Sequence, residues 1–106
     1  MTDIDVNCPG LLTIRCRRRR TLKLTLKDQA RAGATYAFTI YKDDGTVLYT
    51  ESSTAQVPKI TVESSLNVVL KDLDFMPATG MYRYDFVRTV TAEIKPVIEG
   101  SIIIMP

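Results

Sequence analysis

The amino-acid sequence predicts an all-β sandwich. Apolar and polar residues alternate with a period of two through most of the chain, and turn-forming residues recur about every ten positions. No segment keeps the 3.6-residue periodicity of an amphipathic helix. The chain has 106 residues, of which 45% are hydrophobic and 25% charged, as in an ordinary globular domain. We therefore expect a single domain over residues 1–106, in which residues 1–11 form an extended N-terminal arm.

The clearest strand is TLKLTLKD, residues 21–28, in which three leucines alternate with polar residues. Residues 36–41 alternate in the same way. They lead into Asp43-Asp44-Gly45-Thr46, an Asp-Gly turn signal that predicts a hairpin with a returning strand over residues 47–51. Two shorter strands are predicted over residues 59–63 and 66–70, which are rich in β-branched side chains.

A different pattern follows. Leu73, Phe75 and Met76 fit one helical turn that Pro77 and Gly80 end, and we expect this turn to cap one end of the core.

Two strands close the chain. Residues 81–90 place an aromatic row on one face, Tyr82, Tyr84 and Phe86, which is more typical of a core than of a ligand platform. Residues 96–104 place Ile98, Gly100, Ile102 and Ile104 on one side. Seven or eight short antiparallel strands with these turns predict an immunoglobulin-like β-sandwich.

The basic residues are concentrated in IRCRRRRTLKL, residues 14–24, which contains five arginines: Arg15, Arg17, Arg18, Arg19 and Arg20. They carry +5 in a chain of net charge +2, so that the remaining residues sum to −3. Cys16 and Leu22 have the parity of core positions, so one uninterrupted strand would bury Arg18 and Arg20 at a prohibitive cost. The chain must therefore turn, bulge or leave the sandwich between Cys16 and Thr21.

Three interpretations of the arginine run remain open. It protects an exposed strand edge by its charge, it docks onto an acidic protein surface, or it binds nucleic acid. The net acidic body argues against nucleic acid, because binders of that class spread basic residues over a face.

The residue types exclude most familiar catalytic sites. The chain contains no histidine, no CxxC pair and no glycine-rich phosphate loop. Two carboxylate pairs remain as acid–base candidates, Asp43 with Asp44 and Asp72 with Asp74, but each lies in a turn-like context where aspartate is common. We expect no catalytic, cofactor-binding or metal-binding residues, and thus a protein that is not an enzyme.

Cys8 and Cys16 are the only cysteines. No stretch has the length and hydrophobicity of a membrane span or a secretion signal, and we expect both thiols to be reduced.

Four segments, in this order, resemble small immunoglobulin-like sandwich proteins of tailed bacteriophages and prophages, including the N-terminal domain type of baseplate upper proteins. They are Arg20-Thr21-Leu22-Lys23-Leu24, Gly33-Ala34-Thr35-Tyr36-Ala37-Phe38, Gly80-Met81-Tyr82-Arg83-Tyr84-Asp85 and Glu99-Gly100-Ser101-Ile102-Ile103-Ile104. The resemblance covers residues 14 to 105. Where that family commonly has Arg-Gly-Asp/Asn-Thr, this chain has Arg18-Arg19-Arg20-Thr21.

The resemblance implies a structural part of the virion without catalysis, on a tail, baseplate or capsid. It would be present in several copies, contact other virion proteins and be assembled in the host bacterial cytoplasm.

Two alternatives remain. A single-domain adhesion or carbohydrate-binding sandwich would use exposed aromatics, for which Tyr41 and Tyr49 beside the Asp-Gly turn, on the expected outer face, are the candidates. A small nucleic-acid-binding β protein would use the arginine run with neighbouring tyrosines for base stacking. The candidate partner-binding residues are Arg15, Arg17, Arg18, Arg19, Arg20, Tyr41 and Tyr49.

Overall fold

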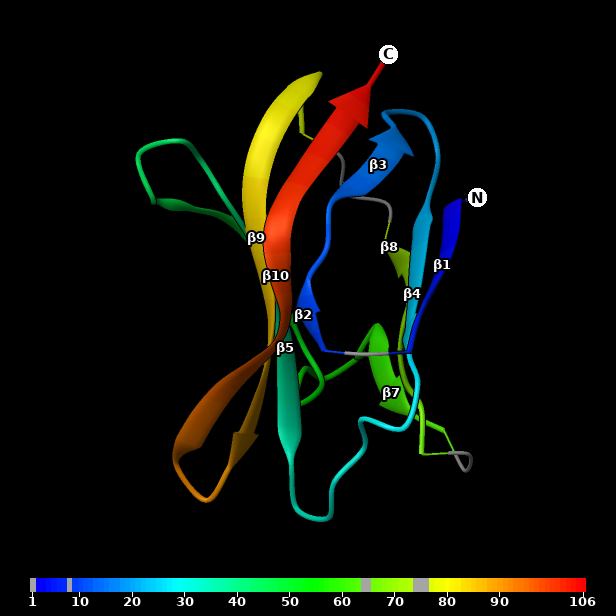
Figure 1. The fold of residues 1–106 in the computed structure, drawn as a ribbon, viewed down its shortest axis with the longest axis vertical. Helices are drawn as coiled ribbons and strands as arrows, with labels where there is room; N and C mark the ends of the chain where they lie inside the picture. Colours follow the sequence, from blue (N-terminus) through cyan, green and yellow to red (C-terminus); the bar gives the residue numbers. More distant parts are fainter. Residues whose placement is uncertain (1, 8, 64–65, 74–76) are drawn as a thin grey trace.

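The computed structural model describes residues 2–7, 9–63, 66–73 and 77–106, and these form two mixed β-sheets that face each other (Figure 1). Within the described residues the strands are β1 (Thr2–Val6), β2 (Gly10–Leu11), β3 (Ile14–Arg17), β4 (Leu22–Leu26), β5 (Thr35–Tyr41), β6 (Val47–Ser52), β7 (Ile60–Val62), β8 (Val68–Leu73), β9 (Gly80–Val90) and β10 (Glu93–Met105). The all-β class is confirmed. The described chain forms ten strands, more than the seven or eight expected.

Among these residues there is no helix with the length and apolar character needed to cross a membrane.

The smaller sheet has the strand order β1-β4-β8-β7. The larger sheet has the order β2-β10-β9-β5-β6, and β3 pairs with β10 next to β2. The chain therefore enters in the smaller sheet, crosses to the larger one for β2 and β3, and returns to the smaller one at β4.

The expectation of a purely antiparallel sandwich with an N-terminal arm is wrong. β1 pairs with β4 in parallel, from Thr2↔Leu22 to Val6↔Leu26, and β2 and β3 both pair with β10 in parallel. The physical reason is that alternation shows which side chains share a face but not the direction of the neighbouring strand. Residues 2–6 do alternate, with Ile4 and Val6 inward and Asp3 and Asp5 exposed.

The core lies between the sheets and contains the residues that alternation assigned to it. The leucines of β4 are fully buried, and so are Phe38 of β5 and Phe86 of β9. The ring of Phe38 lies 5.7 Å from that of Tyr84 and 5.8 Å from that of Phe86, measured between ring centroids. Ile102 and Ile104 of β10 complete this layer.

The β5–β6 hairpin forms at the predicted Asp-Gly turn. The Lys42 N–H donates to the Thr46 carbonyl at 2.9 Å, and Gly45 has a positive φ of 85°. The register shifts in this hairpin, because Tyr41 pairs with Val47 while Ile40 pairs with Tyr49. Leu48 is thus an extra residue in β6, and it reverses the parity of that strand.

Two further elements differ from expectation. Leu73 belongs to β8, where it pairs with Leu22, and not to a helical turn; Phe75 and Met76 of the expected cap lie outside the described residues.

β10 begins at Glu93, earlier than expected, because Thr91 and Ala92 form a two-residue turn after β9. Both have positive φ, 48° and 66°, which matches the turn type that suits a twisted hairpin.

Candidate partner-binding surface

The five arginines, called the arginine cluster below (Arg15, Arg17, Arg18, Arg19 and Arg20), lie along β3 and in the turn that follows it. β3 belongs to the larger sheet and β4 to the smaller one, so this turn joins the two sheets at the end of the molecule where the C-terminus lies (Figure 1). The Arg18 N–H donates to the Met105 carbonyl at 2.8 Å, and the Arg20 N–H donates to the Arg17 carbonyl at 3.1 Å. These bonds hold the backbone of the turn in place.

The predicted break between Cys16 and Thr21 is confirmed. Ile14 and Cys16 are buried on one side of the turn and Leu22 on the other, while the five arginines are exposed. The chain thus changes sheets where continued alternation would have buried guanidinium groups.

Among the described residues, no guanidinium group of the cluster lies within 4.0 Å of an Asp or Glu side-chain oxygen. The one hydrogen bond that these groups make to the described residues is long, 3.4 Å from Arg17 Nη1 to the main-chain oxygen of Pro106, the last residue of the sequence. The ion pairs that do form among the described residues use lysines, such as Lys71 with Glu63 at 3.0 Å. The charge of the cluster is therefore open to an outside partner.

A depression of about 370 Å³ lies beside the cluster. Three of its lining residues are Arg15, Arg17 and Arg20, and the others are Thr2, Cys16 and Met105. Because Thr2 comes from β1 and Met105 from β10, the depression lies at the end of the sandwich where both sheets contribute. Three residues of the cluster thus line one depression.

Cys16 is the one thiol near this depression that the structure describes, and it is free. Burial raises its pKa to about 11, so the thiol is protonated at neutral pH and is a poor nucleophile. Cys8 lies outside the described residues, and the expectation of two free thiols is met only at Cys16.

Tyr41 lies on the outer face of the larger sheet, as expected, and on the same face as Arg15 and Arg17. The strand registers establish this. Arg15 is opposite Ile103, and Ile103 is opposite Met81. Arg83 follows Met81 by two residues, so it lies on the same face of β9, and Tyr41 is opposite Arg83. The Tyr41 hydroxyl donates to Asp85 Oδ2 at 2.8 Å. Partial burial and the Asp85 carboxylate raise the pKa of Tyr41.

Tyr49 does not lie on that outer face, and its placement there is corrected. It is opposite Ile40, a fully buried residue, and it packs against the core cluster from the edge strand β6. Its hydroxyl donates to Glu51 Oε2 at 2.5 Å. The extra residue Leu48 reverses the parity of β6, which the sequence pattern did not reveal. Tyr41 and Tyr49 therefore do not form one exposed aromatic platform.

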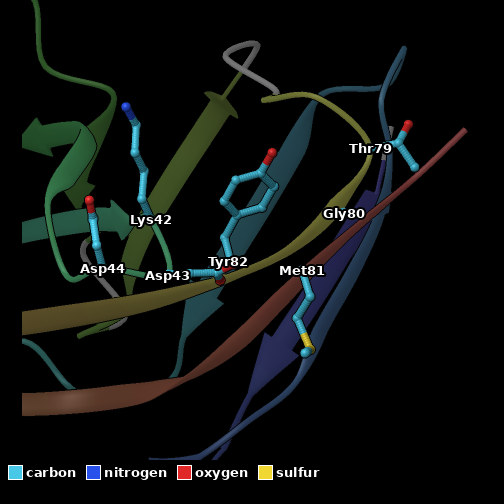
Figure 2. A pocket seen from close by; sticks show the side chains of 7 residues that line it. All are labelled: Lys42, Asp43, Asp44, Thr79, Gly80, Met81 and Tyr82. Atoms are coloured by element: carbon cyan, nitrogen blue, oxygen red, sulfur yellow. The ribbon is translucent and has the colours of Figure 1, made fainter.

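The carboxylate pair Asp43 and Asp44 lies in the β5–β6 turn, beside a depression of about 450 Å³ whose other side is the start of β9 (Figure 2). Asp44 Oδ1 accepts hydrogen bonds from the Thr46 N–H at 2.9 Å and from the Thr46 hydroxyl at 2.5 Å. These bonds lower the pKa of Asp44, so it is ionised at neutral pH and acts as a turn residue. The Asp72 side chain and Asp74 lie outside what the structure describes.

Three charged residues on the outer face were not expected to be functional: Arg83, Asp85 and Glu99. Alternation in residues 81–90 does place Arg83 and Asp85 on the other face of the strand from the aromatic row. Their position beside Glu99 depends on the β9–β10 register, which the sequence alone does not determine.

Comparison of the sequence with protein-family models and with curated proteins found no match.

Proposed function

We propose that this chain is a non-enzymatic interaction module that docks onto an acidic protein surface through the arginine cluster. The observation that carries the proposal is that five exposed arginines lie in β3 and in the turn that follows it, where backbone hydrogen bonds hold the chain. Among the described residues, no Asp or Glu side-chain oxygen lies within 4.0 Å of their guanidinium groups. Arginine is suited to this role because its planar group forms paired hydrogen bonds with carboxylates. Such pairs at an interface steer the encounter and fix its orientation.

The setting that we propose is a bacteriophage particle, with the chain as a multi-copy part of a tail, baseplate or capsid. The four segments that resemble phage sandwich proteins support this. They form four strand regions here, at β4, β5, β9 and β10.

The strand order supports an immunoglobulin-like topology as part of the same proposal. β4, β8 and β7 are adjacent in one sheet, and β10, β9, β5 and β6 follow each other in the other. If β4 is taken as the second strand of an immunoglobulin domain, this corresponds to the order B-E-D opposite G-F-C-C′. β1 is then an additional strand on the free edge of β4.

The two alternatives have less support. The aromatic pair that a carbohydrate-binding sandwich would use is divided between two faces, with Tyr41 outside and Tyr49 at the core side. Nucleic acid would contact a single cluster of five arginines on a body that sums to −3, whereas phosphate binding favours charge spread over a face.

The test replaces Arg17, Arg18, Arg19 and Arg20 together with serine and follows incorporation of the chain into purified particles by quantitative mass spectrometry. We expect the fold to keep its stability within about 1 kcal/mol, because exposed charges contribute little to stability, and incorporation to fall by at least about tenfold. A matched control replaces four exposed or half-exposed lysines, Lys27, Lys42, Lys71 and Lys95, with serine.

The control changes the net charge by the same amount and should be incorporated normally. Normal incorporation of the arginine variant would refute the proposal. So would nanomolar binding of the unmodified chain to DNA at physiological salt that the arginine variant loses, because that result would assign the cluster to nucleic acid.

A further inference from the structure

The outer face of the larger sheet carries a groove formed by two adjoining depressions of about 190 and 230 Å³. Both depressions include Tyr41, Arg83 and Asp85. The smaller one extends to Leu11 and Glu99 at the β2 side, and the larger one to Gly45 in the β5–β6 turn. We call this set of residues the outer groove.

The outer groove contains two carboxylates in an unfavourable arrangement. Asp85 of β9 and Glu99 of β10 are directly opposite each other in the antiparallel register. Like charges at such a pair of positions destabilise a sheet. Among the described residues neither carboxylate has a cationic nitrogen within 4.0 Å, and Asp85 accepts only the neutral Tyr41 hydroxyl. A cation from outside would relieve this repulsion.

The shape of the groove suits an arginine side chain. Leu11, which is 84% exposed, is opposite Glu99 and offers an apolar wall for the methylene groups of an arginine stem. Gly100 lines the same depression. A guanidinium group in the smaller depression would then reach Glu99 and Asp85, which both line it.

We propose that the outer groove binds the arginine cluster of a second copy of this chain. Charge complementarity within one sequence supports this occupant: the cluster carries +5 and the rest of the chain sums to −3. Arg83 also lines the groove, but among the described residues no Lys or Arg nitrogen lies within 4.0 Å of the Asp85 or Glu99 carboxylate. This inference rests on the proposed function and names the acidic partner.

The positions of the two surfaces determine the type of assembly. The turn that carries the cluster lies at the end of the sandwich beside the C-terminus (Figure 1). The groove residues lie on the outer face of the larger sheet. Because donor and acceptor are different surfaces, each copy can bind two others, one at each surface. Such contacts give a closed ring or an open filament when each copy binds two others, and a two-fold dimer when both contacts form reciprocally between the same two copies.

The experiment uses two variants of the full chain and light scattering coupled to size-exclusion chromatography. The donor variant replaces Arg17, Arg18, Arg19 and Arg20 with serine, and the acceptor variant is Glu99→Lys. Glu99 is exposed, and its replacement removes the repulsion from Asp85, so the acceptor variant should be at least as stable as the original chain in thermal denaturation. Glu93→Lys, at another exposed position of β10, is the matched control.

We expect the unmodified chain and the control to associate at about 0.1 M salt and to dissociate near about 1 M, where the Debye length falls from about 10 to about 3 Å. Each variant alone should associate at least about tenfold more weakly. An equimolar mixture of the two variants should form a one-to-one pair and stop, because only one working donor and one working acceptor remain.

A monomeric unmodified chain at low salt, or a mixture of variants that does not pair, would overturn the inference. The particle assay separates this failure from that of the proposed function. If the donor variant is still lost from particles in that case, the cluster docks onto a different acidic protein; if it is incorporated normally, the proposed function fails as well.

Discussion

Cys16 connects the arginine cluster to the hydrophobic core at the level of a single residue. Its side chain is 1% exposed, while the flanking Arg15 and Arg17 are exposed. The strand thus alternates between the most buried and the most hydrated kinds of side chain within three residues. The buried thiol holds β3 against the core, and this fixes the direction in which Arg15 and Arg17 point.

We predict that the Cys16 thiol makes the fold sensitive to alkaline pH. The pKa of this thiol rises from 9.0 to about 11 on folding because burial disfavours the thiolate. A group whose pKa is raised on folding stabilises the fold at pH values below its unfolded pKa, and the contribution is lost as the pH rises through the folded pKa. The free energy of unfolding should therefore fall between pH 9 and about 11, by on the order of 2 kcal/mol.

The measurement is denaturant unfolding across this pH range for the original chain and for Cys16→Ala. Tyr84 titrates in the same direction, because burial and the nearby Glu99 carboxylate raise its pKa, but it is unchanged in both proteins. The Cys16→Ala variant should lose less stability with rising pH. Equal slopes for the two proteins would contradict the prediction.

At the scale of elements, β10 depends on a glycine at one position. Gly100 has a φ of +150°, and a side-chain carbon placed there would lie 2.5 Å from the Leu12 carbonyl oxygen. The Leu12 segment separates β2 from β3, and it is held over Gly100 from two sides. The Leu12 N–H donates to the Glu99 carbonyl at 3.0 Å, and the Tyr84 hydroxyl donates to the Leu12 carbonyl at 2.6 Å.

We predict that Gly100→Ala destabilises the protein by about 1–3 kcal/mol, because either the Leu12 backbone or β10 must move. The matched control is Gly10→Ala, since Gly10 has a similar φ of +139° but nothing within 4 Å of the added carbon. Denaturant unfolding should show a larger loss for Gly100→Ala than for the control. Equal losses would mean that backbone strain alone, and not the contact with Leu12, explains the glycine.

The elements also show what the sequence could predict. Alternation identified the inward faces of β4, β9 and β10, and the Asp-Gly signal identified the β5–β6 turn, because these patterns depend on residues close in the chain. The exposure of the arginine cluster followed from the cost of burying a charge.

Features that depend on distant residues could not be predicted in this way. The parallel neighbours of β1 and β3 and the bulge that turns Tyr49 inward are of this kind. The outer groove is another, because Asp85 and Glu99 meet only through the β9–β10 register.

At the scale of the whole molecule, the first strands connect the two sheets. β1 extends the smaller sheet, β2 and β3 extend the larger one, and the turn with the arginine cluster leads back to the smaller sheet at β4. The Thr2 N–H donates to the Thr21 carbonyl at 2.8 Å, so the start of β1 lies directly beside the end of this turn. The cluster is therefore supported by strands of both sheets. Because its backbone is already held in place, less conformational entropy is lost when it docks.

If β1 is an integral strand, its inward side chains must contribute to stability. Val6 is 8% exposed within the core and Ile4 packs against it, whereas Asp3 and Asp5 are exposed. We predict that Ile4→Ala combined with Val6→Ala lowers the free energy of unfolding by about 2–4 kcal/mol, since both side chains leave buried apolar contacts. The control pair, Asp3→Ala with Asp5→Ala, removes only the exposed ion pair of Asp5 with Lys27 at 3.5 Å and should change it by less than about 1 kcal/mol. If residues 2–6 were instead an unattached arm, both double variants would have the same free energy of unfolding as the original chain in denaturant. That result would contradict the prediction and remove one of the two supports of the arginine cluster.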